Sequence, residues 1–226
     1  MFNLSLERLL YIVPAIIVAL TFHEYAHARV AKAFGDPTAQ DAGRLTLNPL
    51  KHLDPVGTLL LIVAGFGWAK PVPINPWYFQ GSRKKKIMAV SVAGPLMNLL
   101  EAVVGAGVMS LMVHFTSGNS SVMQWLLYFL FYYVQINVVL AVFNLIPVPP
   151  LDGSKILAGL LPDSKMNVIL GLERYGFAIL LLLVFIPNIL GWFGLPEIDI
   201  LGAIITKPAY WIINGIFSLM GIPIQL

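Results

Sequence analysis

The chain has 226 residues, of which 58% are hydrophobic and only 11% charged, with a net charge of +3 and no cysteine. Soluble domains carry about 25% charged residues, so this composition indicates a protein surrounded largely by lipid. The absence of cysteine excludes disulfides, thiolate metal sites and a cysteine nucleophile. Because no basic segment is interleaved with aromatic residues in a polar context, we expect no nucleic-acid partner.

Four apolar stretches are long enough to cross a bilayer as helices, which takes about 20 residues: 6–34, 87–115, 122–146 and 175–193. A fifth, 198–222, is interrupted by Lys207-Pro208 and fits either a kinked span or an interfacial helix. The first stretch has no signal-peptide cleavage site after it, so we expect it to be retained.

The segment between the first two spans, residues 35–86, is rich in proline, glycine and asparagine. Its apolar run, 56–66, is too short to cross as a helix. It predicts a short β-hairpin or a re-entrant element, which could bind an extended substrate by strand addition. The expected fold is a single all-α integral membrane domain, residues 1–226, with four to six transmembrane helices.

Lysine and arginine placement predicts the orientation in the cell membrane. The connection after the first span holds Lys32, Arg44, Lys51, Lys70 and the run 83–86, whereas the next connection, 116–121, holds no lysine or arginine. The third connection again holds basic residues. Since cytoplasmic loops carry the excess of lysine and arginine, the first and third connections are expected in the cytoplasm and the N-terminus outside.

The strongest chemical signal is the motif His23-Glu24-Tyr25-Ala26-His27. On a helix, positions i and i+4 share one face, about 6 Å apart along the axis, so both imidazoles can bind one zinc ion. Glu24 is then placed to act as a general base on water without being a ligand. Ionisable residues inside apolar helices are usually functional; the alternative is a polar cluster that packs helices.

Catalytic zinc usually has three protein ligands and an open position. Asp152 follows the cytoplasmic end of the third span, so it can lie at the depth of the two histidines. His114 lies at the opposite end of the second span and is excluded by the predicted orientation. His52 stays open as an alternative ligand, although a hydrogen bond that fixes its loop is the simpler role.

Asp152 comes after a proline-rich segment, 147–150, which reads Pro-Val-Pro-Pro. Proline removes a backbone donor and clashes with the preceding turn, so an extended segment is expected here. Gly153 permits a tight turn before a short helix from about Ser154, which would leave the carboxylate on a rigid support facing the metal. The alternative role for Asp152 is a helix N-cap.

These motifs resemble the site-2 proteases, intramembrane zinc metalloproteases that cleave membrane-spanning or membrane-associated segments. The resemblance covers about residues 8–190 and includes Asn144-x-x-Pro147-x-x-x-Leu151-Asp152-Gly153, Asn48-Pro49, Asp54-Pro55-x-Gly57 and Ala93-Gly94-Pro95-x-x-Asn98. The chain looks like a compact prokaryotic member of this family, without a PDZ or CBS domain. Its expected location is the plasma membrane.

The resemblance implies the roles of several residues. Asp152 matches the third zinc ligand, and Asn144 matches an asparagine that engages the substrate backbone or the oxyanion. Residues 8–153 correspond to a catalytic core of three helices with one zinc ion and an active site towards the cytoplasm. The implied partners are the lipid bilayer and a membrane-protein substrate with a transmembrane segment.

Two other classes of function are alternatives for this sequence. A non-proteolytic zinc-binding membrane protein or transporter also places ionisable residues in the membrane, but it has no need of Glu24 beside the first histidine. A membrane-anchored peptidase for soluble peptides would need an aqueous domain, and the sequence has none. Asn98 is expected to bond across helices, and the glycines at 94, 105 and 107 to allow close packing.

Overall fold

The computed structural model describes residues 6–64, 67–115, 120–162, 166–194, 196 and 198–222. Within them, four helices are long and apolar enough to cross a membrane: α1 (Leu6–Ala33), α4 (Arg83–Phe115), α5 (Ser121–Asn144) and α8 (Ile200–Leu219). The first three confirm the predicted spans to within a few residues at each end. The length and apolar composition of these helices indicate a multi-pass membrane protein.

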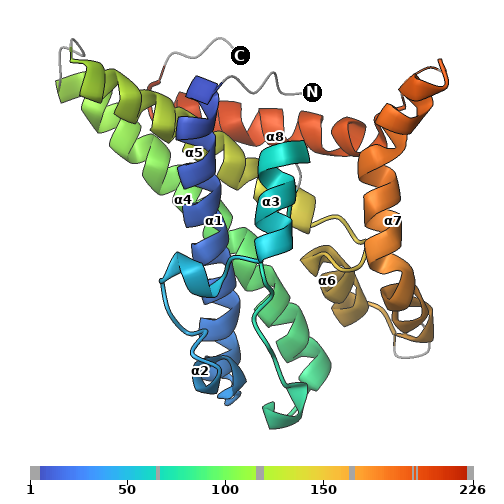
Figure 1. Cartoon of the computed structure of the whole chain (residues 1–226). Coiled ribbons are helices and arrows are strands. Elements are labelled where there is room, and N and C mark those ends of the chain that lie inside the picture. Colours follow the sequence, from blue (N-terminus) through green and yellow to red (C-terminus); the bar gives the residue numbers. More distant parts are fainter. Residues whose placement is uncertain are drawn as a thin grey trace.

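Helices α1, α4 and α5 pack directly against one another (Figure 1). Alanines lie at their contact faces and are completely buried: Ala15 and Ala19 of α1, Ala102 and Ala106 of α4, and Ala141 of α5. Small side chains let helix backbones approach closely in a membrane. This close packing brings the polar residues of α1 against α4.

The connection after α1 begins at Gly35, whose φ of 97° ends the helix in a conformation that favours glycine. It contains α2 (Thr38–Asp41), the 3₁₀ turns η1 (Pro49–Lys51) and η2 (Pro76–Tyr78), and helix α3 (Pro55–Ala64). Residues 67–75 are extended, and we call them the strap. The strap returns the chain to α1, as its contact with Glu24 shows below.

The predicted β-hairpin at 56–66 is wrong, because residues 55–64 form helix α3; residues 65 and 66 lie outside the described part. Asp54 caps this helix, as its Oδ1 accepts the backbone N–H groups of Val56 and Gly57 at 3.0 and 2.9 Å. Pro55 follows at the first helical position, which proline favours. The described residues contain only the isolated antiparallel bridge Leu53–Ala69 and no strand. The chain rises along α3 and returns along the strap (Figure 1), a path that resembles a re-entrant element.

The last two helices are α7 (Met166–Trp192), which contains residues 175–192 of the fourth predicted stretch, and α8. Among the described residues, the apolar part of α7 is Arg174–Pro187, which is shorter than the four helices that could cross a membrane. Helix α8 continues through Lys207-Pro208 without a break. In Figure 1 it runs across the molecule, transverse to α1 and α7. Of the two alternatives for this segment, this orientation favours the interfacial helix.

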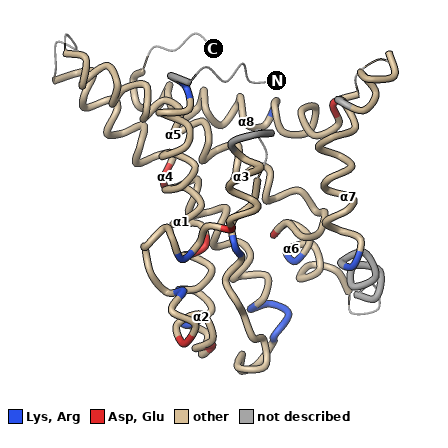
Figure 2. Tube along the Cα trace, viewed as in Figure 1, with Lys and Arg blue, Asp and Glu red and all other residues tan. Residues whose placement is uncertain are grey.

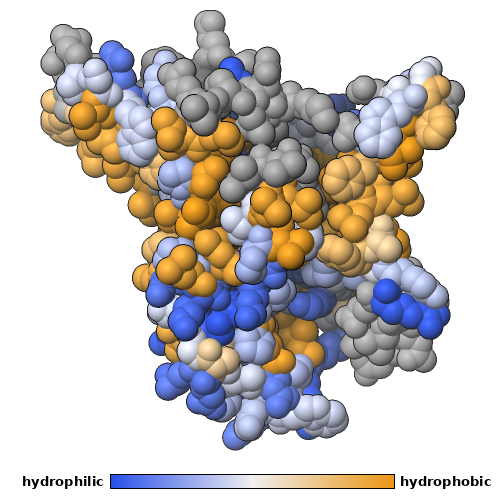
Figure 3. Space-filling model, viewed as in Figure 1, coloured by the Kyte–Doolittle hydropathy of each residue, from blue (hydrophilic) through white to orange (hydrophobic). Residues whose placement is uncertain are grey.

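Charged residues gather in the half of the molecule that contains α2 and α6 (Figure 2). Apolar side chains cover much of the other half in the view of Figure 3. Helix α1 ends and α4 begins on one side of the molecule, and α4 ends on the opposite side, where α5 begins (Figure 1). Which side faces the cytoplasm stays a prediction from the lysine and arginine distribution.

The orientation can be measured with single cysteines, because the chain has none of its own. Ser82→Cys, before α4, and Ser121→Cys, at the start of α5, lie at opposite ends of α4. A membrane-impermeant thiol reagent should label Ser82→Cys only from the cytoplasmic side and Ser121→Cys only from outside. The reverse pattern would show that the molecule is inverted.

Candidate metal centre

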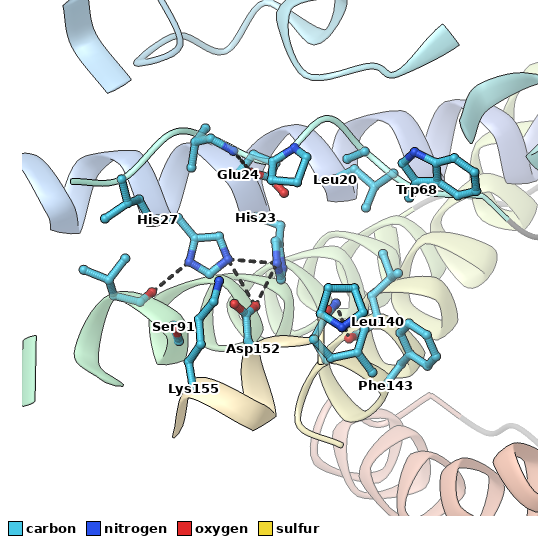
Figure 4. A pocket seen from close by; sticks show the side chains of 18 of the residues that line it. Leu20, His23, Glu24, His27, Trp68, Ser91, Leu140, Phe143, Asp152 and Lys155 are labelled. Atoms are coloured by element: carbon cyan, nitrogen blue, oxygen red, sulfur yellow. Dashed lines mark hydrogen bonds and ion pairs between the residues drawn. The ribbon is translucent and has the colours of Figure 1, made fainter. Parts of the chain in front are cut away.

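Three side chains that can bind a metal converge between α1 and α6 (Asp152–Leu160). His23 and His27 lie one turn apart on α1, and Asp152 is the first residue of α6. Figure 4 shows the three side chains pointing toward one another, and all three residues are buried. Segments far apart in the chain thus place two imidazoles and a carboxylate in one buried space.

The distances in this cluster suit a zinc ion. The Nε2 atoms of His23 and His27 lie 3.0 Å apart, and they lie 3.3 and 3.2 Å from Oδ2 of Asp152. Zinc–ligand bonds of 2.0–2.2 Å in a tetrahedron place the ligand atoms about 3.3–3.6 Å apart. Two imidazoles and one carboxylate are a donor set that catalytic zinc sites use.

Hydrogen bonds behind the imidazoles determine which nitrogen faces the cluster. The Nδ1–H of His27 donates to the carbonyl of Val90 at 2.7 Å, and Nδ1 of His23 lies 2.6 Å from Oδ1 of Asn98. The Asn98 amide nitrogen donates to Oδ1 of Asn137 at 2.8 Å and to the carbonyl of Ala19, so its oxygen faces His23. In both histidines Nδ1 is therefore bound to an acceptor and Nε2 faces the cluster, the arrangement that metal-ligating histidines show.

Asp152 contacts the histidines and does not cap its own helix. The N-cap of α6 is Leu151, and no side chain caps it. Burial alone would raise the pKa of Asp152, but hydrogen bonds and charge from His23 and His27 lower the pKa well below its ordinary value. The carboxyl group is thus ionised, the state in which it can bind a metal.

Two glycines allow this arrangement by leaving space. A methyl group built on Gly94 would lie 2.6 Å from Nε2 of His23 and closer still to Nε2 of His27. A methyl group on Gly153 would collide with the carbonyls of Leu145 and Ile146. Gly153 has no positive φ, so it serves the close approach of α6 to the end of α5 and not the tight turn that the sequence suggested.

Glu24 lies beside the cluster and is buried. Its Oε2 accepts a hydrogen bond from the backbone N–H of Val72, in the strap, at 2.8 Å. Among the described residues, no hydrogen bond reaches the other oxygen, Oε1. The carboxylate is therefore held at one oxygen and has the other available.

A cavity of about 550 Å³ opens onto these residues. Its apolar walls come from the strap, α5 and α7, and include Trp68, Leu140, Phe143 and Phe177. Asn144 also lines it, at the end of α5, and its amide nitrogen donates to the carbonyl of Leu140 at 3.0 Å. The cavity thus has largely apolar walls beside the polar cluster.

The other histidines lie outside the cluster. The ring of His52 is buried, and its Nε2 donates to the carbonyl of Thr46 at 2.8 Å, which is the loop-fixing bond that the sequence favoured for it. His114 lies at the far end of α4. Glu101, also on α4, accepts a hydrogen bond from the hydroxyl of Tyr133 at 2.5 Å, so it pairs with a polar group of α5.

Sequence reasoning missed several residues that support the site. Gly94 was assigned to helix packing alone, Arg44 only to the orientation in the membrane, and no role was predicted for Val72 or Asn137. A partial signal existed for Gly94, which lies in one of the motif segments. None existed for Val72, because its contribution is a backbone N–H that every residue except proline carries.

Comparison with known proteins finds a peptidase family and relatives named as zinc metalloproteases. Residues 106–184 match the family model "Peptidase family M50". The chain is 44% identical over 185 residues to "Putative zinc metalloprotease YwhC" of Bacillus subtilis, covering 78% of this chain and 81% of that protein. It is 33% identical over 182 residues to "Putative zinc metalloprotease Rip2" of Mycolicibacterium smegmatis, covering 78% and 67%. No solved structure matches the chain.

Asp152→Asn tests whether this carboxylate binds the metal. The change is nearly isosteric, so insertion and thermal stability should stay close to those of the wild type. A neutral amide is a poor zinc ligand, and zinc affinity should fall by more than the roughly 10- to 100-fold that loss of an outer partner costs. His52→Ala serves as the control and should keep about one zinc per chain by elemental analysis. Zinc loss in His52→Ala with retention in Asp152→Asn would assign the third ligand to His52.

Gly94→Ala tests the space beside the imidazoles. An extra methyl group in a packed site costs about 1–3 kcal/mol, so zinc affinity should fall on the order of 10- to 100-fold. Gly107→Ala on the same helix is a matched control, since a methyl group there meets nothing within 4 Å. Equal zinc affinity in the two variants would contradict the assigned role of Gly94.

Proposed function

This chain belongs to peptidase family M50, the site-2 protease family, and we propose that this membrane zinc metalloprotease hydrolyses peptide bonds in or near transmembrane segments of membrane proteins. The observation that carries the proposal is the convergence of His23, His27 and Asp152 beside Glu24, in a cavity with apolar walls. The catalytic core is the three-helix unit of about residues 8–153, within one polytopic domain that spans residues 1–226.

In the proposed site, His23, His27 and Asp152 would hold one zinc ion. Bound zinc supplies Lewis acidity, which makes water a better nucleophile at neutral pH and polarises the scissile carbonyl. Asn98 and the Val90 carbonyl keep both imidazoles in the required tautomer through their Nδ1–H groups.

Glu24 moves the protons of the reaction. Its free Oε1 takes a proton from water as the water oxygen attacks the scissile carbonyl carbon. The same carboxyl group then gives this proton to the leaving amine nitrogen as the C–N bond breaks. Water and one peptide bond are consumed, and a carboxylate and an amine are released. The bond from Val72 N–H to Oε2 keeps the carboxylate aimed during both transfers.

Asn144 is proposed to bind the substrate backbone or the oxyanion. It lines the cavity at the end of α5, and one amide hydrogen donates to the carbonyl of Leu140. That bond orients the amide and leaves its second hydrogen for a ligand. Preorganised donors of this kind stabilise charge that develops on the scissile carbonyl oxygen.

The shape of the cavity suggests an apolar, unwound substrate. Trp68 of the strap and Phe177 of α7 meet edge to face, with ring centroids 5.2 Å apart, and both line the cavity. A helical peptide bond is covered by its own turn, so the substrate segment must unwind before cleavage. The site is proposed to lie towards the cytoplasmic side, where charged residues gather in the half of the molecule that contains α2 and α6 (Figure 2).

Glu24→Gln tests this mechanism. Glutamine keeps the side-chain size and an acceptor for Val72 N–H but cannot take a proton. The cleavage rate of a reconstituted membrane-protein substrate should fall about 10²- to 10⁴-fold, with zinc content near one per chain. Loss of zinc together with activity would mean that Glu24 is a ligand, and near-normal turnover would exclude the proteolytic mechanism.

A further inference from the structure

The general base is connected to a buried arginine through the strap. Arg44 lies in the loop after α2, and only 5% of its surface is exposed. Its Nη2–H donates to the carbonyl of Lys70 at 2.5 Å, and its Nη1–H donates to the carbonyl of Pro71 at 3.3 Å. The next residue is Val72, whose N–H donates to Glu24.

Burying a guanidinium is costly, so its partners matter. Burial lowers the pKa of Arg44 from its ordinary value, and the negative charge of Glu24 acts in the opposite direction. Within the described residues, Arg44 has no carboxylate within ion-pair distance, and its Nε has no hydrogen-bond partner. The two carbonyls of the strap are therefore the main partners of this cation.

The strap has little freedom around the contact with Glu24. Prolines at 71 and 73 flank Val72 and restrict the backbone. The N–H of Lys70 is bound to the carbonyl of His52 at 2.8 Å, and the carbonyls of residues 70 and 71 are bound to Arg44. Because the Pro71 carbonyl and the Val72 N–H belong to one planar peptide group, the direction of this N–H follows from how Arg44 holds that carbonyl and the one before it.

We propose that Arg44 is a positioning residue for catalysis: its planar guanidinium sets the strap so that Val72 N–H holds Oε2 of Glu24 and leaves Oε1 for the water proton. Arginine suits this role because its fork of donors binds two acceptors in fixed geometry, which the single ammonium of lysine does not. The inference rests on the proposed function, since it takes Glu24 to be the base.

The chain offers a matched control at the other end of the strap. Oδ2 of Asp36 accepts the backbone N–H of Asn75 at 2.7 Å. Asp36→Ala therefore releases the strap three residues beyond Val72. It also removes the bonds from Thr38 to Oδ1 of Asp36 at the start of α2, but it removes no partner of the Lys70 and Pro71 carbonyls. It separates general loosening of the strap from loss of the contact that aims Glu24.

The first measurement compares turnover at saturating zinc. Arg44→Gln should lower kcat about 10- to 100-fold, with KM, zinc per chain and Tm little changed. Arg44→Lys should keep the fold and show a smaller loss of kcat. Asp36→Ala should lower Tm, and its loss of kcat should be smaller than that of Arg44→Gln. Equal loss of kcat in Asp36→Ala and Arg44→Gln, or wild-type kcat in Arg44→Lys, would overturn the proposal.

A double variant distinguishes a failure of this inference from a failure of the proposed function. If Arg44 acts through Glu24, adding Arg44→Gln to Glu24→Gln should leave the residual rate unchanged, because effects on one catalytic unit are not additive. If the residual rate fell further by the full factor that Arg44→Gln causes alone, the proposal would be overturned. Full activity in Glu24→Gln alone would instead refute the proposed function.

A readout that does not depend on activity completes the test. Hydrogen–deuterium exchange of the peptide covering 67–75, measured on zinc-free protein, should be faster in Arg44→Gln than in the wild type. The strap should exchange at the wild-type rate in Glu24→Gln, whose side chain still accepts the Val72 N–H. Unchanged exchange in Arg44→Gln would mean that Arg44 does not hold the strap.

Discussion

The structure depends on one constraint: polar groups buried in an apolar helix bundle must find partners inside the protein. An unpartnered buried polar group costs about 1–3 kcal/mol, and a charged one more. His23, Glu24 and His27 all lie on one stretch of a hydrophobic helix, and each is bound by a group from another element. Their partners come from α4, α6 and the strap.

Satisfying these groups also prepares the chemistry. A hydrogen bond at Nδ1 is what turns Nε2 of each histidine toward the cluster, and a bond at Oε2 is what leaves Oε1 of Glu24 available. The close approach that makes these bonds possible comes from residues without bulk, the alanines between α1, α4 and α5 and Gly94 beside the imidazoles. Helix packing and site geometry therefore have the same cause.

The connection after α1 contacts Glu24 and lines the cavity, although it is not part of the helix bundle. Arg44, Asp36 and His52 each bind backbone groups there, and the strap they support faces both Glu24 and the cavity. Loops that carry function are commonly placed by a rigid scaffold. In this protein the anchoring side chains of the loop are themselves buried, which makes it part of the scaffold.

The sequence by itself determined the membrane class, the first three spans and the identity of the candidate site residues. Long apolar runs and the spacing of His23 and His27 are local properties, and the resemblance identified Asp152 and Asn144. The prediction of a β-hairpin failed at 56–66, where an Asp54 cap and Pro55 outweigh a composition that suits a strand. Capping chemistry is also local, so that signal was present and was missed.

Only the tertiary structure decided how the site is supported. The distances among His23, His27 and Asp152, the bond from Asn98 to His23 and the space beside Gly94 all join segments far apart in the chain. The contact of Val72 with Glu24 uses a backbone N–H, which leaves no mark on the residue type. Such contacts depend on the relative placement of helices and loops, and a linear sequence pattern does not contain that placement.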